Sequence, residues 1–197
     1  ESLQEYTTNY IWVRLKDIAG NLTTYYVFYI LKDTTPPNIT NNEVGQDPNW
    51  RNASRSYNVD FSDYKSKLSQ IQYRAFASTG GANPISVWTD ITTLPSGTSQ
   101  YFSDWQLNFT LLQEGTNYIA VQAIDLAGNT STYYDAFKVL KDITPPTITD
   151  AQEGDLTWRS TNNGLYNVDF ADSLSLFTTA QTLIRSGPDN SSPLIDN

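Results

Sequence analysis

The 197-residue sequence contains no cysteine, no methionine and no histidine. Without cysteine no disulfide framework can form, and without cysteine and histidine the usual ligands of zinc are missing. Ser–His–Asp and Cys–His catalysis are excluded as well, because both need an imidazole as the general base. Any chemistry in this chain must therefore depend on carboxylates, lysines, hydroxyl groups or aromatic rings.

Basic residues are scarce, and long apolar runs are missing. The 12 Lys and Arg residues oppose 21 Asp and Glu residues, which gives a net charge of −9 and a pI near 4.3. Such a charge repels phosphate backbones and anionic lipids, and no apolar run approaches the roughly 20 residues of a membrane helix. We expect no nucleic-acid partner and no membrane insertion. A surface this acidic and this rich in Asn, Ser and Thr favours an extracellular location, either secreted or on the cell surface.

What the chain does contain is an internal repeat. Segments 9–21 and 117–129 both begin with Asn-Tyr-Ile, both alternate apolar residues as a half-buried strand does, and both end in Asp-x-Ala-Gly-Asn. The two copies lie 108 positions apart, whereas Tyr-Asn-Val-Asp-Phe recurs at 57–61 and 166–170 with a spacing of 109. One residue has therefore been inserted in the strand after the turn. A period near 109 is typical of a whole domain and not of a solenoid unit.

Paired prolines predict the domain boundaries. The sequence Asp-x-Thr-Pro-Pro occurs at 33–37 and again at 142–146. Proline fixes φ and cannot donate to a central β-ladder, so Pro36 and Pro145 mark linkers. The predicted organisation is the C-terminal strands of one module at 1–33, a complete module at 34–142, and the N-terminal strands of a third module at 143–197.

Short strands separated by turns fill the sequence. Alternation predicts strands at about 10–16 and 23–31, and then at about 38–43, 56–62, 69–77, 85–92, 101–110, 116–124 and 131–140. No window has helical periodicity. Seven short strands in a module of about 109 residues are the number expected of an immunoglobulin-like sandwich. The predicted fold class is all-β, with tandem immunoglobulin-like β-sandwich modules.

One further motif carries a family resemblance. Segment 112–118, Leu-Gln-Glu-Gly-Thr-Asn-Tyr, resembles the tyrosine corner before the sixth strand of fibronectin type III domains. With the Asp-x-Ala-Gly-Asn turns and the proline linkers, the chain is similar to bacterial Ig-like repeats of large secreted or cell-surface proteins. The resemblance implies structural roles for Tyr10, Tyr118, Gly20, Gly128, Pro36 and Pro145. Such repeats serve as spacers, adhesin stalks or accessory modules of enzymes, so the fold alone does not identify a ligand.

Four aspartates recur at strand ends and linkers, namely Asp17, Asp33, Asp125 and Asp142. Adhesin repeats of the kind that the chain resembles can bind calcium at module junctions through carboxylates and carbonyls, which makes these residues candidate calcium ligands. The same positions also suit Asx turns and the capping of backbone N–H groups. Calcium is the one cofactor that this reasoning leaves open.

Aromatic residues are abundant, with 13 Tyr, 8 Phe and 5 Trp. Those at repeated positions are predicted to fill cores, namely Trp50, Trp158, Tyr57 and Phe61. Two adjacent pairs must each place one ring outward, because neighbouring residues of a strand face opposite sides. These pairs, Tyr25–Tyr26 and Tyr133–Tyr134, are candidates for stacking on sugar rings. The alternative function is therefore a carbohydrate-binding accessory module of a secreted enzyme.

Catalysis is not predicted. Glycoside hydrolysis needs only two carboxylates, but no spacing in this sequence singles out such a pair. The predicted function is a non-catalytic structural or adhesive module of a bacterial surface protein. Two strands cannot bury enough apolar surface alone, so the partial modules are expected to find partners. Either they meet head to tail in other copies and form a filament, or they belong to neighbouring modules of a longer chain.

Overall fold

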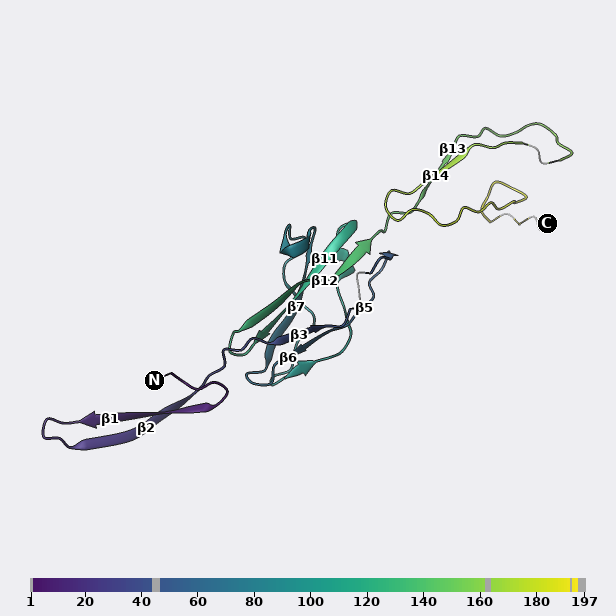
Figure 1. Ribbon diagram of the computed structural model, residues 1–197. Helices are drawn as coiled ribbons and strands as arrows, with labels where there is room; N and C mark the ends of the chain where they lie inside the picture. Colours follow the sequence, from purple (N-terminus) through teal and green to yellow (C-terminus); the bar gives the residue numbers. More distant parts are fainter. Residues whose placement is uncertain (1, 44–46, 162–163, 192, 195–197) are drawn as a thin grey trace. The chain divides into compact units, whose positions relative to one another are not determined.

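The computed structural model describes residues 2–43, 47–161, 164–191 and 193–194 (Figure 1). The chain divides into two compact units, residues 1–141 and 142–197, and we describe each by itself. Strands form almost all the regular structure. The described residues contain no α-helix, and their only helical turns are the short 3₁₀ segments η1 (Thr79–Gly81) and η2 (Phe109–Leu111). None of the described segments is a helix long and apolar enough to cross a membrane.

The first unit opens with a β-hairpin. Strands β1 (Thr8–Lys16) and β2 (Leu22–Leu31) pair only with each other, in a two-stranded antiparallel sheet. The connecting turn is closed by Asp17, whose carboxylate accepts hydrogen bonds from the N–H and the side-chain amide of Asn21. Gly20 has a φ of +95°, a conformation that glycine adopts without steric cost.

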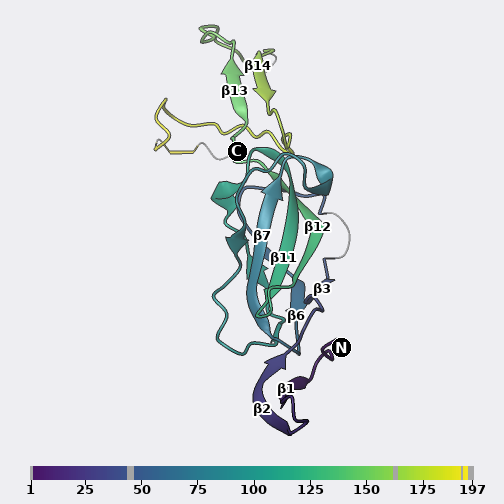
Figure 2. The ribbon, with the colours of Figure 1, turned by 90° about the vertical axis from the view of Figure 1, so that its left-hand side faces the viewer.

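Two larger sheets follow within the same unit. The first has the order β4-β12-β11-β7-β8 and is antiparallel except where β4 meets β12. Its strands are β4 (Trp50–Arg51), β7 (Leu68–Phe76), β8 (Thr89–Asp90), β11 (Gly115–Asp125) and β12 (Thr130–Lys141). The second has the order β3-β6-β9, and a β5–β10 pair accompanies it. These strands are β3 (Asn38–Asn41), β5 (Ser56–Tyr57), β6 (Val59–Ser62), β9 (Gln100–Tyr101) and β10 (Trp105–Gln106). Figure 2 shows β7, β11 and β12 side by side.

One hydrophobic core joins these sheets. It receives alternate residues from β5, β6, β7, β10, β11 and β12, as expected of sheets that pack face to face. At its centre the ring of Tyr57 stacks on Phe137, with centroids 4.1 Å apart, and Trp105 packs against both rings. The prediction that Tyr57 and Phe61 are core residues is confirmed, since both are buried.

The prediction of a core position was wrong for two tryptophans. Trp50 is 36 % exposed, because it lies on the two-residue edge strand β4. Trp158 is fully exposed, in a segment without regular secondary structure. The core tryptophan is instead Trp105, which stands in a part of the sequence that has no second copy.

The strands at the sheet edges are shorter than the alternation predicts. The segment expected at 85–92 contains only β8, and the segment expected at 101–110 contains β9 and β10 with η2 after them. Each of these strands pairs with a neighbour on one side only, so fewer ladder hydrogen bonds hold it in extended form. The predicted insertion lies in β12. There the register shifts opposite Ile119–Val121, and Asp135 takes a φ of +53°, as in a β-bulge.

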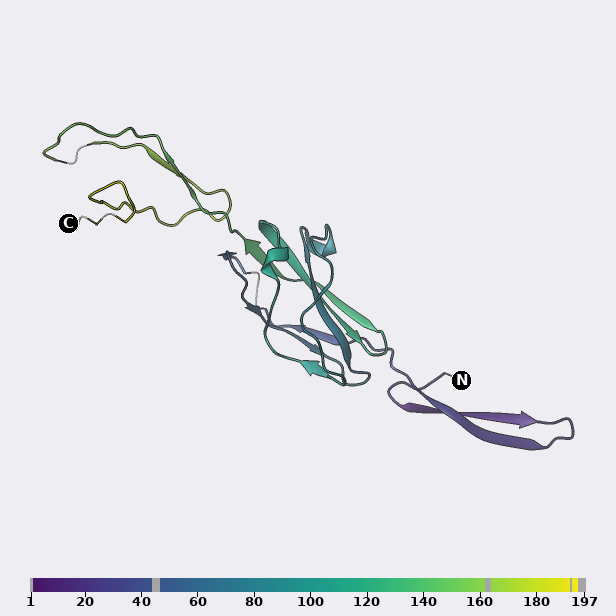
Figure 3. The same cartoon turned by 180° about the vertical axis from the view of Figure 1, so that it is seen from behind.

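The second unit contains one small sheet. Strands β13 (Thr147–Asp150) and β14 (Val168–Ala171) pair antiparallel, with Thr147 opposite Ala171. This register equals that of β3 and β6 at a spacing of 109, where Asn38 lies opposite Ser62. After β14 the described residues contain no further strand and only an isolated bridge between Arg185 and Leu194 (Figure 3).

Candidate cation site

Three aspartates meet at one end of the large sheets in the first unit. Carboxylate oxygens of Asp33, Asp63 and Asp125 all lie within 4.8 Å of one another. Asp63 and Asp125 are buried, and Asp33 is half-buried. Three like charges this close repel one another unless a cation or hydrogen-bond donors compensate them.

Asp125 is fixed by the turn between β11 and β12. Its carboxylate accepts the N–H of Asn129 at 2.8 Å and the side-chain amide of Asn129 at 2.8 Å. Gly128, with a φ of +91°, lets the chain reverse within this turn. Asn129 in turn donates its amide to the carbonyl of Asp33 at 3.1 Å, so the same turn also holds the segment after β2.

Asp63 follows β6 directly. Its Oδ1 accepts the N–H groups of Lys65 at 3.0 Å and Lys67 at 2.8 Å, and Lys67 takes a positive φ of 79° to close this loop. No hydrogen bond among the described residues ends on Oδ2 of Asp63, so this oxygen can serve as a ligand.

Asp33 comes from the linker after β2. Its Oδ1 accepts the N–H of Thr35 and its Oδ2 accepts the N–H of Ser66, each at 3.0 Å. Burial works to raise the pKa of Asp33, but these hydrogen bonds and the charge of Lys65 outweigh it, so the pKa lies below its ordinary value. Asp33 is therefore held as a carboxylate.

The nearby lysines do not form ion pairs with the cluster. The ammonium group of Lys65 lies over the ring of Tyr6, 5.1 Å from its centroid, and that of Lys67 donates to the carbonyl of Tyr64 at 2.9 Å. None of the salt bridges in the described residues involves Asp33, Asp63 or Asp125. Backbone N–H groups and the side-chain amide of Asn129 donate the hydrogen bonds that compensate the carboxylates.

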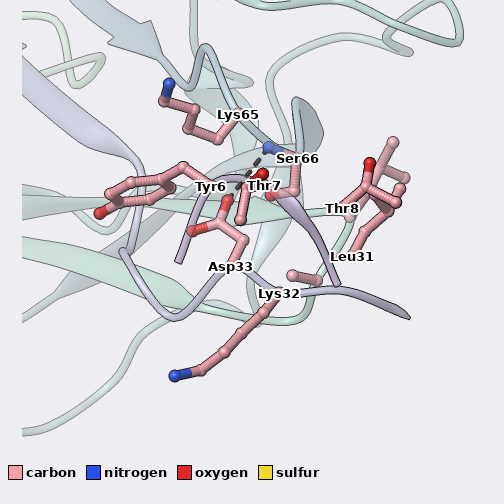
Figure 4. Close-up of a pocket in the computed structure, with 10 residues that line it drawn as sticks. Tyr6, Thr7, Thr8, Leu31, Lys32, Asp33, Lys65 and Ser66 are labelled. Carbon is pink, nitrogen blue, oxygen red and sulfur yellow. Dashed lines mark hydrogen bonds between the residues drawn. The ribbon is translucent and has the colours of Figure 1, made fainter. Parts of the chain in front are cut away.

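A pocket of about 440 Å³ adjoins Asp33. Its walls come from β1, from the end of β2, from the loop after β6 and from the turn after β11, and Figure 4 shows Asp33 directed toward Ser66 within it. Tyr6 and Lys65 line the same pocket, and in Figure 4 they lie on the side away from Thr8 and Leu31. The Tyr6 hydroxyl also hydrogen-bonds Thr35, which ties the start of the hairpin to the linker.

The donor set suits calcium. Ca²⁺ binds oxygen ligands at about 2.3–2.6 Å, so two ligand oxygens on one ion lie at most about 5 Å apart. The spacing of the three carboxylates falls within that limit. Magnesium demands a stricter octahedral arrangement and retains water, whereas calcium accepts six to eight oxygens in flexible geometry.

Of the four predicted calcium ligands, the structure brings Asp33 and Asp125 together. Asp17 occupies the same turn in the β1–β2 hairpin and binds Asn21 as Asp125 binds Asn129, but it is not part of this group. Asp142 lies in the second unit, where it accepts the N–H groups of Thr144 and Ser175, each at 3.0 Å. These hydrogen bonds reproduce those of Asp33 at a spacing of 109.

Sequence reasoning missed Asp63. The internal repeat contains the signal that identifies this residue. When the repeat is extended two residues beyond Phe61 and Phe170, Val-Asp-Phe-Ser-Asp at 59–63 matches Val-Asp-Phe-Ala-Asp at 168–172. Asp172 accepts the N–H groups of Leu174 and Leu176 as Asp63 accepts those of Lys65 and Lys67. Each aspartate of the group thus has a counterpart, although the lysines beside Asp63 are replaced by leucines.

The tyrosine candidates for sugar stacking lie at the surface. All four are exposed, at 73 % for Tyr25, 36 % for Tyr26, 45 % for Tyr133 and 50 % for Tyr134. Tyr26 lies between Tyr10 and Trp12, with ring centroids 5.9 and 5.6 Å apart. Tyr134 instead packs edge-on against Phe76 and covers Gly81, where a Cβ would clash with the ring. The hairpin therefore presents the larger exposed aromatic cluster.

The corner before β11 is closed by Asn117 and not by Tyr118. The buried Asn117 side chain accepts the N–H of Gln113 at 3.1 Å and donates to the carbonyls of Gln113, Gly115 and Val139. Tyr118 points to the opposite face of the strand, and none of the hydrogen bonds in the described residues involves its hydroxyl. Before β1, Asn9 makes the equivalent four hydrogen bonds, and Tyr10 takes the place of Tyr118.

No model of a known protein family matches the sequence, and no curated protein matches it either.

Proposed function

We propose that the chain is a non-catalytic structural or adhesive segment of an extracellular surface protein, built from tandem immunoglobulin-like modules that bear load along a rod or stalk. The observation that carries the proposal is the recurrence of two local structures, each present twice in the chain. The β1–β2 hairpin repeats β11–β12 with its Asp–Asn turn and its Asn corner, and β13–β14 repeats the register of β3–β6. Repeats joined by proline linkers favour a spacer over a single binding domain.

The strand order supports the immunoglobulin-like assignment. Seven strands form the main ladders of the two sheets, in the orders β3-β6-β9 and β12-β11-β7-β8, with β4 added beside β12. In immunoglobulin-like sandwiches the third, sixth and seventh strands share a sheet in the same way. A bacterial origin rests on the sequence resemblance alone.

A divalent cation, most simply Ca²⁺, fits the proposal. Bound by Asp33, Asp63 and Asp125, it would join the segment after β2 to the loop after β6 and to the turn after β11. That cross-link would stiffen the connection between the hairpin and the sheets that follow. Each of the three aspartates has an aspartate counterpart at the repeat spacing, whereas Lys65 and Lys67 have leucine counterparts. This difference favours a ligand role for the carboxylates over pairing with lysine.

Stretching single molecules by their ends tests the mechanical role. Unfolding of residues 33–141 should give one cooperative event that lengthens the chain by about 350 Å, which is the extended length at about 3.6 Å per residue less the length of the folded segment. The force of that event should rise when Ca²⁺ replaces a chelator. A chain that extends without a discrete event would contradict the load-bearing role.

Thermal unfolding with and without Ca²⁺ tests whether the cation binds to the three carboxylates. Extracellular calcium modules have dissociation constants of about 0.1–1 mM, so about 10 mM Ca²⁺ should stabilise the first unit by about 1.4–2.7 kcal/mol. The substitution Asp125→Asn should abolish this gain. Its matched control is Asp17→Asn, which alters the same turn outside the carboxylate group and should leave the gain unchanged. Equal responses of both variants would refute the site.

The second candidate function is carbohydrate binding through the exposed cluster of Tyr10, Trp12 and Tyr26. Rings exposed in this way can stack on sugars. Binding on a glycan array should then be lost in Trp12→Ala and kept in Tyr133→Ala. A chain that binds no glycan eliminates this function and leaves the structural one in place.

A further inference from the structure

One face of the β1–β2 hairpin, here called the outward face, carries aromatic rings beside two cations. Alternate residues of a strand share a face, which places four side chains of β1 on this side, namely Tyr10, Trp12, Arg14 and Lys16. In the register of the hairpin Tyr29 lies opposite Tyr10 and Tyr26 lies opposite Trp12, and residues paired in this way share a face. The ring contacts of Tyr26 with Tyr10 and Trp12 agree with this placement.

The equivalent face of β11 and β12 is open to solvent even though two sheets pack on one core there. Strand β11 gives Val121 to that core, and the alternate residues Tyr118 and Gln122 are half-buried on the other side. Tyr134, the counterpart of Tyr26, is 50 % exposed. The outward face of the hairpin therefore does not owe its exposure to what packs on the opposite, apolar face.

The residues that distinguish the outward face are not repeated in β11 and β12. The equivalent pairs are Trp12 and Ala120, Arg14 and Gln122, Lys16 and Ile124, and Tyr29 and Lys138. Strands β11 and β12 form the same kind of hairpin with alanine and glutamine at these positions. Trp12 and Arg14 are therefore not required by the strand pairing, and a surface role accounts for them better.

Both cations of this face are available to a ligand. Among the residues that the structure describes, no salt bridge and no side-chain hydrogen bond involves Arg14 or Lys16. The only carboxylate between residues 8 and 31 belongs to Asp17, and it is bound to Asn21. The outward face is thus locally positive on a chain whose net charge is −9.

We propose that the outward face binds an acidic glycan, with uncharged sugar rings stacked on Trp12 and Tyr26 and a carboxylate paired with Arg14. A guanidinium group presents a planar fork of donors that matches a carboxylate, and Lys16 adds a second positive charge further along the strand. From Tyr10 to Lys16 the face extends about 20 Å at about 3.3 Å per residue, so it can hold more than one sugar ring. This inference rests on the proposed carbohydrate-binding function and names its substrate class.

Charge favours a glycan over a single-stranded nucleic acid, which could also stack on these rings. A nucleic acid carries one phosphate for each nucleotide, and a chain with a net charge of −9 repels such a ligand outside the outward face. A glycan can carry one carboxylate among uncharged rings. It therefore meets the two cations without bringing further negative charges to an acidic protein.

The test uses the full chain and an array of oligosaccharides in matched pairs, with and without one uronic acid, followed by titration calorimetry on the pair that binds best. The wild type should bind the acidic member about tenfold more tightly, as expected for hydrogen bonds to a charged group. This preference should fall as the salt concentration rises. A thymidine oligonucleotide should bind more weakly than the acidic oligosaccharide.

Two variants install residues that the repeat already contains at the equivalent positions, so both are expected to fold. Arg14→Gln should remove the preference for the acidic member and keep the binding of the neutral one. Trp12→Ala should abolish the binding of both. The control Lys138→Gln removes a cation from the equivalent face of β12 and should change neither affinity.

Equal affinity for both members of every pair would overturn this inference and leave the carbohydrate-binding function in place. A preference that persists in Arg14→Gln, or an oligonucleotide that binds more tightly than the acidic oligosaccharide, would overturn it as well. Absence of binding to every pair would overturn both this inference and the carbohydrate-binding function. None of these results changes the single-molecule unfolding event, which tests the structural role separately.

Discussion

Tyr57 illustrates how a single residue can combine good packing with an unmet polar group. Its ring is buried and stacked on Phe137, yet its hydroxyl is buried without a hydrogen-bond partner in the described part of the chain. Tyr57→Phe keeps the ring and removes the unsatisfied group, so the free energy of unfolding should stay equal or rise by up to about 1 kcal/mol. Urea denaturation measures this change.

Tyr73→Phe is the matched control for that substitution. The Tyr73 hydroxyl accepts the N–H of Asn108 at 2.8 Å, so its removal leaves a donor unpaired and should cost about 1–2 kcal/mol. If both substitutions lower stability equally, the Tyr57 hydroxyl makes a hydrogen bond in solution, which would contradict its assignment as an unsatisfied group.

Asp47 gives the first unit a defined response to acid. Burial works to raise the pKa of Asp47, but the N–H of Asn49, the hydrogen bond and charge of Arg51 and the hydrogen bond of Arg55 outweigh it, so the pKa is lowered. A lowered folded-state pKa means that the stabilisation is complete above the unfolded value of about 3.9 and is lost as the pH falls through the folded value.

The substitution Asp47→Asn should therefore lower the free energy of unfolding by about 2 kcal/mol at pH 7, as expected for hydrogen bonds to a charged group. The difference from wild type should shrink below about pH 4. Urea denaturation at several pH values measures both effects. Asp155, which binds Thr157 and Arg159 in the same way within the second unit, supplies the control Asp155→Asn. A pH-independent difference for Asp47→Asn would contradict the assignment.

At the scale of an element, the corner before β11 depends on Asn117. Asn117→Ala leaves a buried N–H and buried carbonyls unpaired and removes side-chain volume, so it should destabilise the first unit by about 3 kcal/mol. Asn9→Ala breaks the same bonds before β1, where water can replace them, and should change the main unfolding transition by less than about 0.5 kcal/mol. Comparable losses from both would show that the hairpin is buried in solution.

Elements with local signals could be predicted from the sequence. Strands β11 and β12 follow from alternation and the Asp-x-Ala-Gly-Asn turn, because a half-buried strand and a tight turn each restrict residue type locally. The short edge strands β4, β8, β9 and β10 depend on pairing with distant segments, which no local pattern encodes. Trp105 shows the same limit, since its burial depends on the packing of β5 and β12 around it.

The candidate site was predictable only in part for a related reason. Asp33 and Asp125 stand at conspicuous turns and linkers, but their approach to Asp63 follows from the way in which β6 and β11 end at the same side of the molecule. Proximity of this kind is a property of topology. The internal repeat supplies the missing information, because Asp172 preserves the position of Asp63.

At the scale of the whole molecule, residues 33–141 differ from the rest in having two sheets around one core. The hairpin before them and the β13–β14 sheet after them carry apolar residues that are exposed, although the same residue types are buried at the equivalent positions of residues 33–141. This contrast is the basis for treating both as parts of neighbouring modules.

The most direct test is to produce residues 33–142 alone and follow their unfolding in urea by tryptophan fluorescence. The account predicts one cooperative transition, with a midpoint and slope equal to those of the main transition in the full chain under the same conditions. A fragment that has no cooperative transition, or that gains one only when residues 1–32 or 143–197 are restored, would contradict the claim that this segment is a complete module.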